Sequence, residues 1–245
     1  AHLNDKFQKK QMHKFIQDYG ADWFPNLPAY QTFVFRLNRL EPSFQTFGQI
    51  LGRSLTSSIA PETDTLTDSM PVMLAQNGHS YTAKVAREVA DAGFCAAKKT
   101  RFHGVRLHFT AKRQSAKLPR PHQIWLCSGS HHDSRAFKDQ HLELAETDLF
   151  GDKAFADREL ENQIKEQNSK LITPVKKSKN KDLTEFEKYY SRLVSKFRQP
   201  IESLFNWINE KTGIQKAGKV RSTDALMIHC WGKLVVAFYL LVFNY

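Results

Sequence analysis

Cysteine, glycine and proline are all sparse in this chain of 245 residues, and each shortage excludes a class of protein. Three cysteines, an odd number set far apart, exclude a disulfide framework and indicate a reducing compartment. Eleven glycines and nine prolines exclude collagen-like and low-complexity chains. The 41% of hydrophobic residues is ordinary for a globular protein, so the chain is predicted to fold as one large domain, with or without a small annex.

Long apolar runs are absent outside the C-terminal end. The first twenty residues are polar and charged and begin with Ala1, so we expect no signal peptide and a truncated N-terminal region. Residues 225–243 are apolar enough to span a bilayer, but Lys233 lies in their middle, where it would cost about 2.5–3.5 kcal/mol. The segment is therefore predicted to be a buried helix, with no membrane partner and a cytoplasmic location.

Acidic residues are absent from one stretch and crowded into the next. Residues 101–130 hold six Lys or Arg and no acid, residues 131–169 ten acids against five bases, and residues 170–200 nine bases against three acids. The net charge of +11 predicts a polyanionic partner, above all nucleic acid, although each basic block taken alone could be solvated surface. The side chains predicted to contact the DNA backbone are Arg101, Arg106, Lys112, Arg113 and Lys117 in the first block, and Lys170, Lys176, Lys177 and Lys179 in the second.

The hydrophobic pattern divides the chain in two. Residues 1–58 are predicted to form a small helical region that could bind DNA, joined by a Ser/Thr-rich linker to an α/β domain over residues 59–245. Residues 101–113 alternate as in a half-buried strand, and residues 124–127 resemble a strand buried on both faces. Apolar residues at helical spacing run from Phe186 to Ile208. Strands alternating with helices predict a sheet flanked by helices.

Three carboxylates stand at predicted element ends, where ligands of α/β sheets usually bind. Asp68 precedes Ser69-Met70-Pro71, and Asp152 follows Gly151. Pro200 at a helix start would place Glu202 in the first turn, four residues after Arg198. Each alone has a commoner explanation, a turn or cap aspartate and a surface ion pair.

Taken in order, these motifs resemble the DDE transposase domain of bacterial insertion sequences. The motifs are Asp68-Ser69-x-Pro71, Gly104-x-x-x-His108, Gly151-Asp152-Lys153-Ala154-Phe155 and Arg198-x-x-x-Glu202, with a softer match over Phe24–Pro28 and Arg36–Leu40. The resemblance covers the chain from about residue 24 to its end.

This resemblance implies an RNase H-like mixed sheet flanked by helices. It implies that Asp68, Asp152 and Glu202 hold two Mg²⁺ or Mn²⁺ ions and catalyse cleavage and strand transfer on double-stranded DNA, at terminal inverted repeats and target sites. A homo-oligomeric active complex on the bacterial nucleoid is also implied. His108, Lys153, Arg198 and Lys211 would join the basic residues in binding DNA. Two alternatives stay open: a non-catalytic DNA-binding descendant, and a nuclease that cuts without joining.

Several features depart from the family pattern. Ser195 and Asn209 occupy places where related transposases often have Tyr and Lys, and Lys211 is close enough to substitute for the latter. Pro200 is unusual inside a helix, and the Thr-rich stretch before Asp68 predicts a poor central strand. The histidines clustered between residues 103 and 141 lack zinc-finger spacing, so no zinc site is expected, and His108 is more simply a surface residue.

Overall fold

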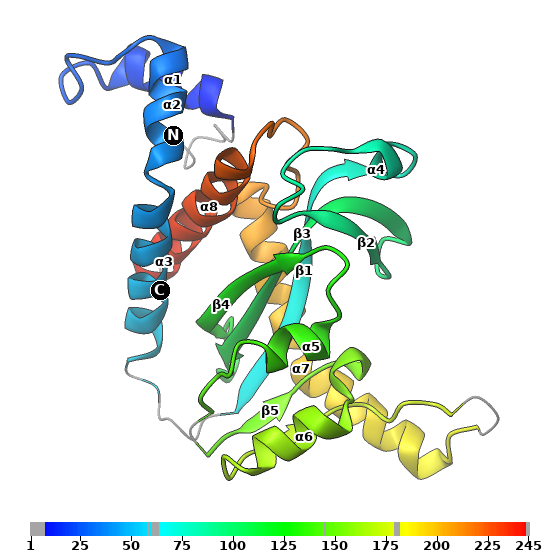
Figure 1. Cartoon of the computed structure of the whole chain (residues 1–245). Coiled ribbons are helices and arrows are strands. Elements are labelled where there is room, and N and C mark those ends of the chain that lie inside the picture. The colour runs from blue at the N-terminus through cyan, green and yellow to red at the C-terminus, as the bar shows by residue number, and fades with distance from the viewer. Residues whose placement is uncertain (1–7, 58, 60–63, 145, 179–181, 244–245) are drawn as a thin grey trace.

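The computed structural model describes residues 8–57, 59, 64–144, 146–178 and 182–243. Six strands form a single sheet in the order β2-β3-β1-β5-β6, and β4 pairs with β3 beside this path (Figure 1). The strands are β1 (Thr65–Gln76), β2 (Asp91–Cys95), β3 (Thr100–Lys112), β4 (Arg120–Ser128), β5 (Asp148–Phe150) and β6 (Lys170–Ile172). The helices are α1 (Lys9–Tyr19), α2 (Tyr30–Arg39), α3 (Glu41–Thr56), α4 (His79–Thr82), α5 (Asp133–Lys138), the short 3₁₀ helix η2 (Lys153–Phe155), α6 (Arg158–Lys165), α7 (Glu185–Thr212) and α8 (Thr223–Phe243).

The sheet is mixed because β1 and β3 pair antiparallel, whereas β5 lies parallel to both β1 and β6. On its other edge β3 pairs with β2 through residues 100–104 and with β4 through residues 105–112. β1 and β3 therefore form the long centre of the sheet, and α7 packs against β1 and β5. This is an α/β fold of the RNase H-like type, as predicted.

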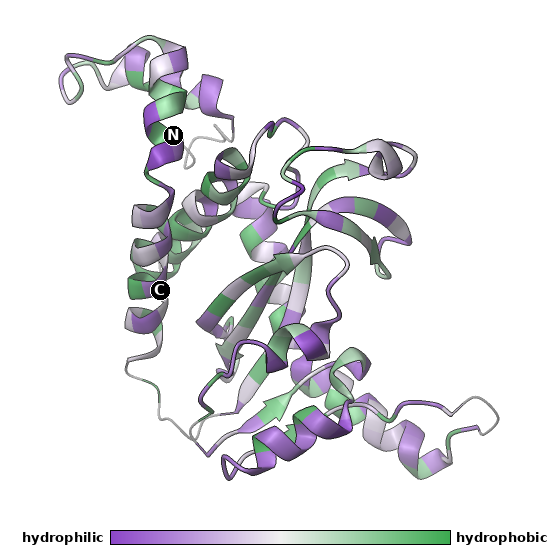
Figure 2. Ribbon diagram, viewed as in Figure 1, coloured by the Kyte–Doolittle hydropathy of each residue, from purple (hydrophilic) through white to green (hydrophobic). Residues whose placement is uncertain are grey.

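Helices cover both faces of the sheet. On one face α7 and α8 pack against β1 and β3, with Ile201 and Phe238 in the same core as Phe109. On the opposite face α5 and α6 cover β4 and β5, and Phe137 packs there against Trp125. Figure 2 shows the apolar residues following the sheet and α8, while α6 is polar on its outer side. β3 is thus buried on both faces along most of its length, and the expectation of a half-buried strand is wrong because α5 covers its second face.

The apolar C-terminal segment forms α8, the one described helix long and apolar enough to cross a membrane, and 56% of its most apolar stretch is buried inside the structure. Lys233 is buried there and donates hydrogen bonds to the carbonyl oxygens of Thr212 (2.7 Å) and Gly213 (3.2 Å). These carbonyls belong to the end of α7, where cations are favoured. The prediction of a buried helix is confirmed, and its central lysine serves to close the last turn of α7.

The N-terminal helices differ in how they meet this body. α1 and α2 project from it, whereas α3 lies along α8 and β4 (Figure 1). The Arg120 guanidinium donates to the carbonyl of Leu55 at 2.8 Å, and Gly48 lies against Trp231. The predicted domain boundary lies between residues 58 and 59. Residues 58 and 60–63 lie outside the described chain. The helix before the boundary, α3, packs against α8 and β4, which follow it.

Gly104 allows the closest approach of β1 and β3. A Cβ built at Gly104 would overlap the carbonyl oxygen of Val72, whereas one at Gly78 would meet no atom within 4 Å. We expect Gly104→Ala to lower the free energy of unfolding by about 1–3 kcal/mol, since overpacking forces backbone to move. Urea denaturation measures this, with Gly78→Ala as the control. Equal stability of the two variants would contradict the packing described.

Candidate functional site

Asp68 lies inside the central strand of the sheet rather than at a strand end. β1 continues to Gln76, past Pro71, and Asp68 pairs in register with Phe109 of β3. The threonines before it are buried and satisfied: Thr67 Oγ1 donates to the carbonyl of Phe109 at 3.1 Å. The expectations of a poor central strand and of a strand-end aspartate are therefore wrong, because the sheet supplies partners for these hydroxyls.

Arg198 joins Asp68 to Glu202. Its Nη2 donates to Asp68 Oδ2 at 2.8 Å and its Nη1 to Glu202 Oε1 at 2.7 Å. The guanidinium is buried, whereas the Glu202 side chain is 53% exposed. One planar cation thus holds two carboxylates from β1 and α7, a geometry for which the arginine fork is well suited.

Arg198 and Glu202, four residues apart, are neighbours on one helix because α7 does not break at Pro200. The helix runs unbroken from Glu185 to Thr212, so the prediction that Glu202 lies in a first turn is wrong. A capping box at Thr184 starts the helix, and Gly213 in the left-handed conformation ends it. An interior proline costs about 3 kcal/mol. Burying Ile201, Leu204 and Ile208, at about 1.5–3 kcal/mol each, outweighs that cost.

Asp152 follows β5, the parallel neighbour of β1, as predicted. Its Oδ1 accepts a hydrogen bond from the backbone N–H of Ala154 at 2.8 Å, which caps η2. Its charge also acts on Asp68. Burial raises the pKa of Asp68 to about 7, Arg198 opposes this rise, and the carboxylates of Asp152 and Asp133 add to it. The two aspartates predicted from sequence are thus electrostatic neighbours.

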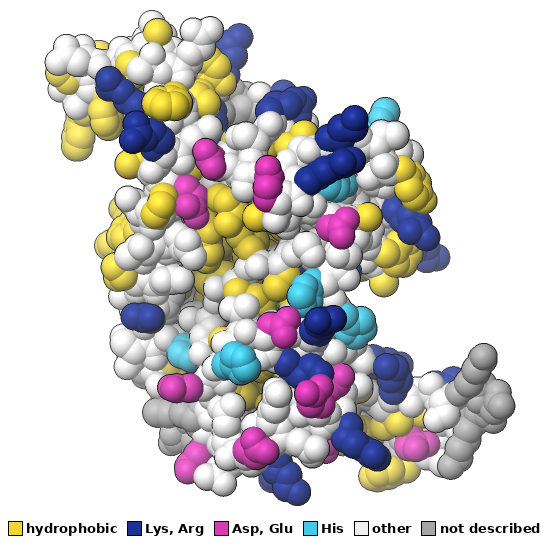
Figure 3. All heavy atoms as spheres, viewed as in Figure 1, with side chains coloured by type: hydrophobic (Ala, Val, Ile, Leu, Met, Phe, Trp, Pro, Cys, Tyr) yellow, Lys and Arg dark blue, Asp and Glu magenta, His cyan; other side chains and the backbone are white. Residues whose placement is uncertain are grey.

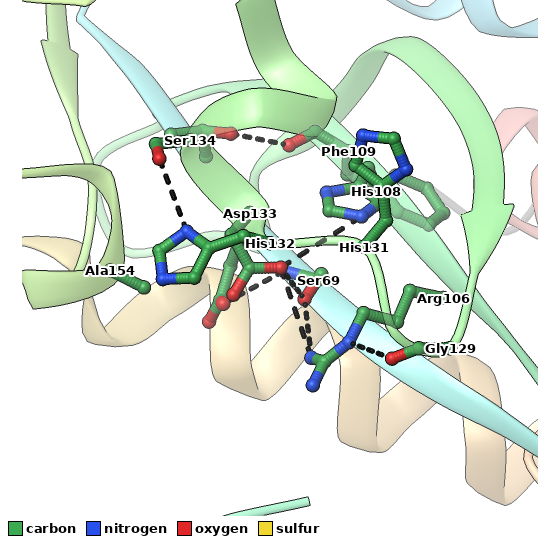
Figure 4. Close-up of polar contacts among 12 residues, drawn as sticks. Ser69, Arg106, His108, Phe109, Gly129, His131, His132, Asp133, Ser134 and Ala154 are labelled. Atoms are coloured by element: carbon green, nitrogen blue, oxygen red, sulfur yellow. Dashed lines mark hydrogen bonds and ion pairs between the residues drawn. The ribbon is translucent and has the colours of Figure 1, made fainter. Parts of the chain in front are cut away.

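Asp133 is the acid that sequence reasoning missed. It is the first residue of α5, and its Oδ1 accepts a hydrogen bond from Ser69 Oγ at 2.7 Å (Figure 4). Arg106 Nη1 lies 3.8 Å from the same oxygen. Ser69 also donates its backbone N–H to Asp68 Oδ1 at 2.8 Å, so one serine connects Asp133 with Asp68. The signal in the sequence was its place three residues after Ser128-Gly129-Ser130, the turn that follows a strand.

His108 is enclosed rather than exposed. Its ring stacks on Trp125 with centroids 5.3 Å apart, and Nε2 lies 3.8 Å from Asp133 Oδ1. Burial lowers the pKa of His108 to about 3, so the ring is neutral at physiological pH. Neither ring nitrogen has a hydrogen-bond partner in the described part of the chain. The expectation of a surface histidine is wrong, and a neutral enclosed ring does not suit a contact with DNA phosphate.

The carboxylates near Asp68 fit a divalent cation in their chemistry, since carboxylate oxygens are the donors that Mg²⁺ prefers. The raised pKa of Asp68 reflects burial and negative charge that Arg198 does not fully offset. Across the residues that the structure describes, no three His, Cys, Asp or Glu side chains stand together as a ready-made set of metal ligands. Asp68 is thus linked to Glu202 through Arg198 and to Asp152 through its charge, and these three acids do not form such a set.

A family model described as "Transposase DDE domain" matches residues 60–222. The chain belongs to this family. No curated protein and no solved structure matches it. The matched range contains Asp68, Asp152 and Glu202, together with Asp133, and it leaves out the helices α1–α3 and all of α8.

The basic residues predicted for this transposase domain divide by exposure. Lys112 and Arg198 are buried, Arg106 is mostly buried, and Arg113 lies over the ring of Phe197 at 4.0 Å. Lys179 lies outside the described residues. The exposed ones, which remain free to reach a DNA backbone, are Arg101, Lys117, Lys153, Lys170, Lys176, Lys177 and Lys211.

The raised pKa of Asp68 makes the stability of the transposase domain depend on pH. The folded state keeps the Asp68 proton up to about pH 7, while the unfolded chain releases it near the ordinary value of 3.8. Stability from this group is therefore complete below about pH 4 and is lost as the pH rises through 7. Between pH 4 and pH 7 the wild-type chain should lose up to about 4 kcal/mol of its free energy of unfolding from this group, at 1.36 kcal/mol per pKa unit. We expect Asp68→Asn to abolish this loss.

Urea denaturation between pH 4.5 and 7.5 in EDTA measures the effect. Asp157→Asn is the contrasting variant, because hydrogen bonding to Leu160 N–H, with help from Lys138, lowers the pKa of Asp157. Asp157→Asn should therefore lower the free energy of unfolding at neutral pH, whereas Asp68→Asn should raise it. Parallel pH profiles for wild type and Asp68→Asn would refute the assignment.

Proposed function

We propose that this transposase domain cleaves DNA strands and transfers them at the ends of an insertion sequence, with Asp68, Asp152 and Glu202 as the ligands of two divalent ions, Mg²⁺ or Mn²⁺. The observation that supports this most directly is the Arg198 bridge, which gathers Asp68 and Glu202 from distant parts of the chain beside Asp152. Carboxylates close together repel one another, and a bound cation would relieve that repulsion.

When bound, two such ions activate a water or a 3′-hydroxyl and stabilise the leaving oxygen of the phosphodiester. The protein supplies the positions of the ligands. The backbone N–H of Ser69 fixes one oxygen of Asp68 and Arg198 fixes the other, so the carboxylate cannot rotate. The cap bond to Ala154 orients Asp152 in the same way. Preorganised ligands of this kind lower the cost of assembling the reacting groups.

Double-stranded DNA is the proposed partner, at terminal inverted repeats and at target sites. The net charge of +11 and the seven exposed lysines and arginines named above favour a phosphate backbone. Strand transfer joins two DNA ends to one target, which favours a homo-oligomer as the active complex. A chain acting on bacterial DNA would work in the cytoplasm, on the nucleoid.

Cleavage assays test the proposed ligands. With linear DNA and Mg²⁺ or Mn²⁺, we expect Asp152→Asn and Glu202→Gln each to reduce cleavage by about a thousandfold, equivalent to about 4 kcal/mol. Their affinity for DNA should stay the same or rise, because a negative charge facing phosphate is lost. Glu210→Gln is the matched control: Glu210 lies on the same helix, 73% exposed, and should keep cleavage within a few-fold.

The alternatives appear as distinct outcomes of this assay. Binding without cleavage by the wild-type chain would indicate a non-catalytic DNA-binding descendant. Nicking without joined products would indicate a nuclease. Full cleavage by Asp152→Asn would overturn the ligand assignment itself.

Salt dependence tests the second basic block. Lys176 is exposed, and Lys177 is exposed and pairs with the exposed Asp182, at 2.6 Å. Replacing both lysines by Ala should flatten the slope of log K against log salt by up to about two units, and should weaken all sequences alike. Lys165→Ala, an exposed lysine in the acidic segment, should leave the slope unchanged. Fluorescence anisotropy at several salt concentrations decides, and an unaltered slope in the double variant would place these lysines away from DNA.

A further inference from the structure

A groove of about 420 Å³ opens beside Asp133, between α4 and β2 on one side and the segment after β4 on the other. This is within the range of about 300–1,000 Å³ typical of ligand pockets. Figure 3 shows the outline of the molecule hollowed between the part that carries α4 and β2 and the part that carries α5 and α6. The groove is lined by Tyr81, Phe94, Arg101, Arg106, His131 and Asp133, among others.

Two aromatic rings in this groove lack the cover that such side chains usually have. Tyr81 of α4 is 69% exposed and Phe94 of β2 is 51% exposed. They come from separate elements, yet both line the same groove. Large exposed aromatics that gather at one concave site mark a binding surface rather than a stray apolar residue.

The charge of the groove is positive. The Arg101 guanidinium lies over the Tyr81 ring at 5.9 Å and forms no hydrogen bond or ion pair with another described side chain or backbone group. The acid that lines the groove, Asp133, already accepts a hydrogen bond from Ser69 and lies near Arg106. An anion entering the groove would therefore meet an unpaired guanidinium beside an aromatic face.

Arg106 makes the groove a built feature rather than a gap between mobile loops. Its Nη2 donates to the carbonyl of Phe94 at 2.8 Å. Its Nε donates to the carbonyl of Gly129 at 3.1 Å (Figure 4). Its Nη1 donates to Ser69 Oγ at 3.3 Å. One guanidinium thus fixes β2, the end of β4 and the residue next to Asp68 with respect to one another.

We propose that this groove binds an unpaired nucleotide of DNA, next to the phosphate held at Asp68. Exposed aromatic rings with arginine beside them are the means by which proteins hold single-stranded bases, by stacking and by contact with the backbone. A paired base keeps both faces inside the duplex and cannot stack on Tyr81 or Phe94. The inference rests on the proposed function, because it takes the strand at Asp68 to be DNA.

Position supports a nucleotide of the same strand. The groove ends at Asp133, which Ser69 links to Asp68 through hydrogen bonds of 2.7 and 2.8 Å. A base displaced from the duplex beside the scissile phosphate would thus have the groove next to it. The groove would then favour DNA whose end is already unpaired.

The test compares two DNA probes in EDTA, where no cleavage occurs. One is a blunt duplex, and the other is the same duplex with a three-nucleotide single-stranded extension that carries 2-aminopurine. We expect the extended probe to bind about tenfold more tightly, the effect of stacking one base, and its 2-aminopurine fluorescence to be quenched. Tyr81→Ala and Phe94→Ala should each remove most of this preference and leave affinity for the blunt duplex unchanged.

Two variants separate stacking from other causes. Tyr81→Phe should keep the preference, because the ring remains, and Tyr239→Ala, which removes an exposed aromatic from α8, should have no effect. Equal affinity of wild type for both probes, or a preference that survives loss of both Tyr81 and Phe94, would overturn the proposal. If the proposal fails while metal-dependent cleavage persists, the proposed function stands; if the preference holds without cleavage, the proposed function fails and the groove remains.

Discussion

The burial of one carboxylate, that of Asp68, close to other acids is the constraint on which the rest of this structure depends. Asp68 lies mostly buried in the central strand, with Asp152 and Asp133 close enough to raise its pKa. Arg198 offsets part of this repulsion by holding Asp68 and Glu202 together in one planar contact. A monovalent guanidinium can hold the folded chain together without neutralising all of these charges.

That bridge requires both of its supports to be stiff. β1 is stiff because it is paired on both sides, by β3 along nearly its whole length and by β5 at its start. α7 is stiff because Ile201, Leu204 and Ile208 anchor the turns beyond Pro200 in the core. Arg106 plays a comparable part on the other side of Asp68, where it ties Ser69 to the carbonyls of Phe94 and Gly129. Asp68 therefore sits between two arginines, one carried by α7 and the other by β3.

Patterns that depend on neighbours in the sequence predicted the fold well. The alternation along β3, the helical spacing from Phe186 to Ile208 and the order of the acidic motifs all belong to this kind. Features set by contacts between distant residues could not be predicted. Asp133 meets Ser69 across 64 positions of sequence, and no local pattern encodes that hydrogen bond. His108 has the alternation of an exposed residue, but α5 and Trp125 enclose it. Pro200 has the local signature of a helix start, and the burial of the residues after it decides otherwise.

The amine of Lys233 ties the last turn of α7 to α8, a helix that lies wholly beyond the range matched by the family. α8 in turn packs along α3, from the other end of the chain. The packed structure is therefore longer than the range matched by the family, since it includes α3 and α8 as well as residues 60–222. A fragment ending at residue 222 would lack Lys233, which holds the far end of the helix that carries Arg198 and Glu202. The first and last helices of this packing, α3 and α8, thus support the site although neither contributes a carboxylate to it.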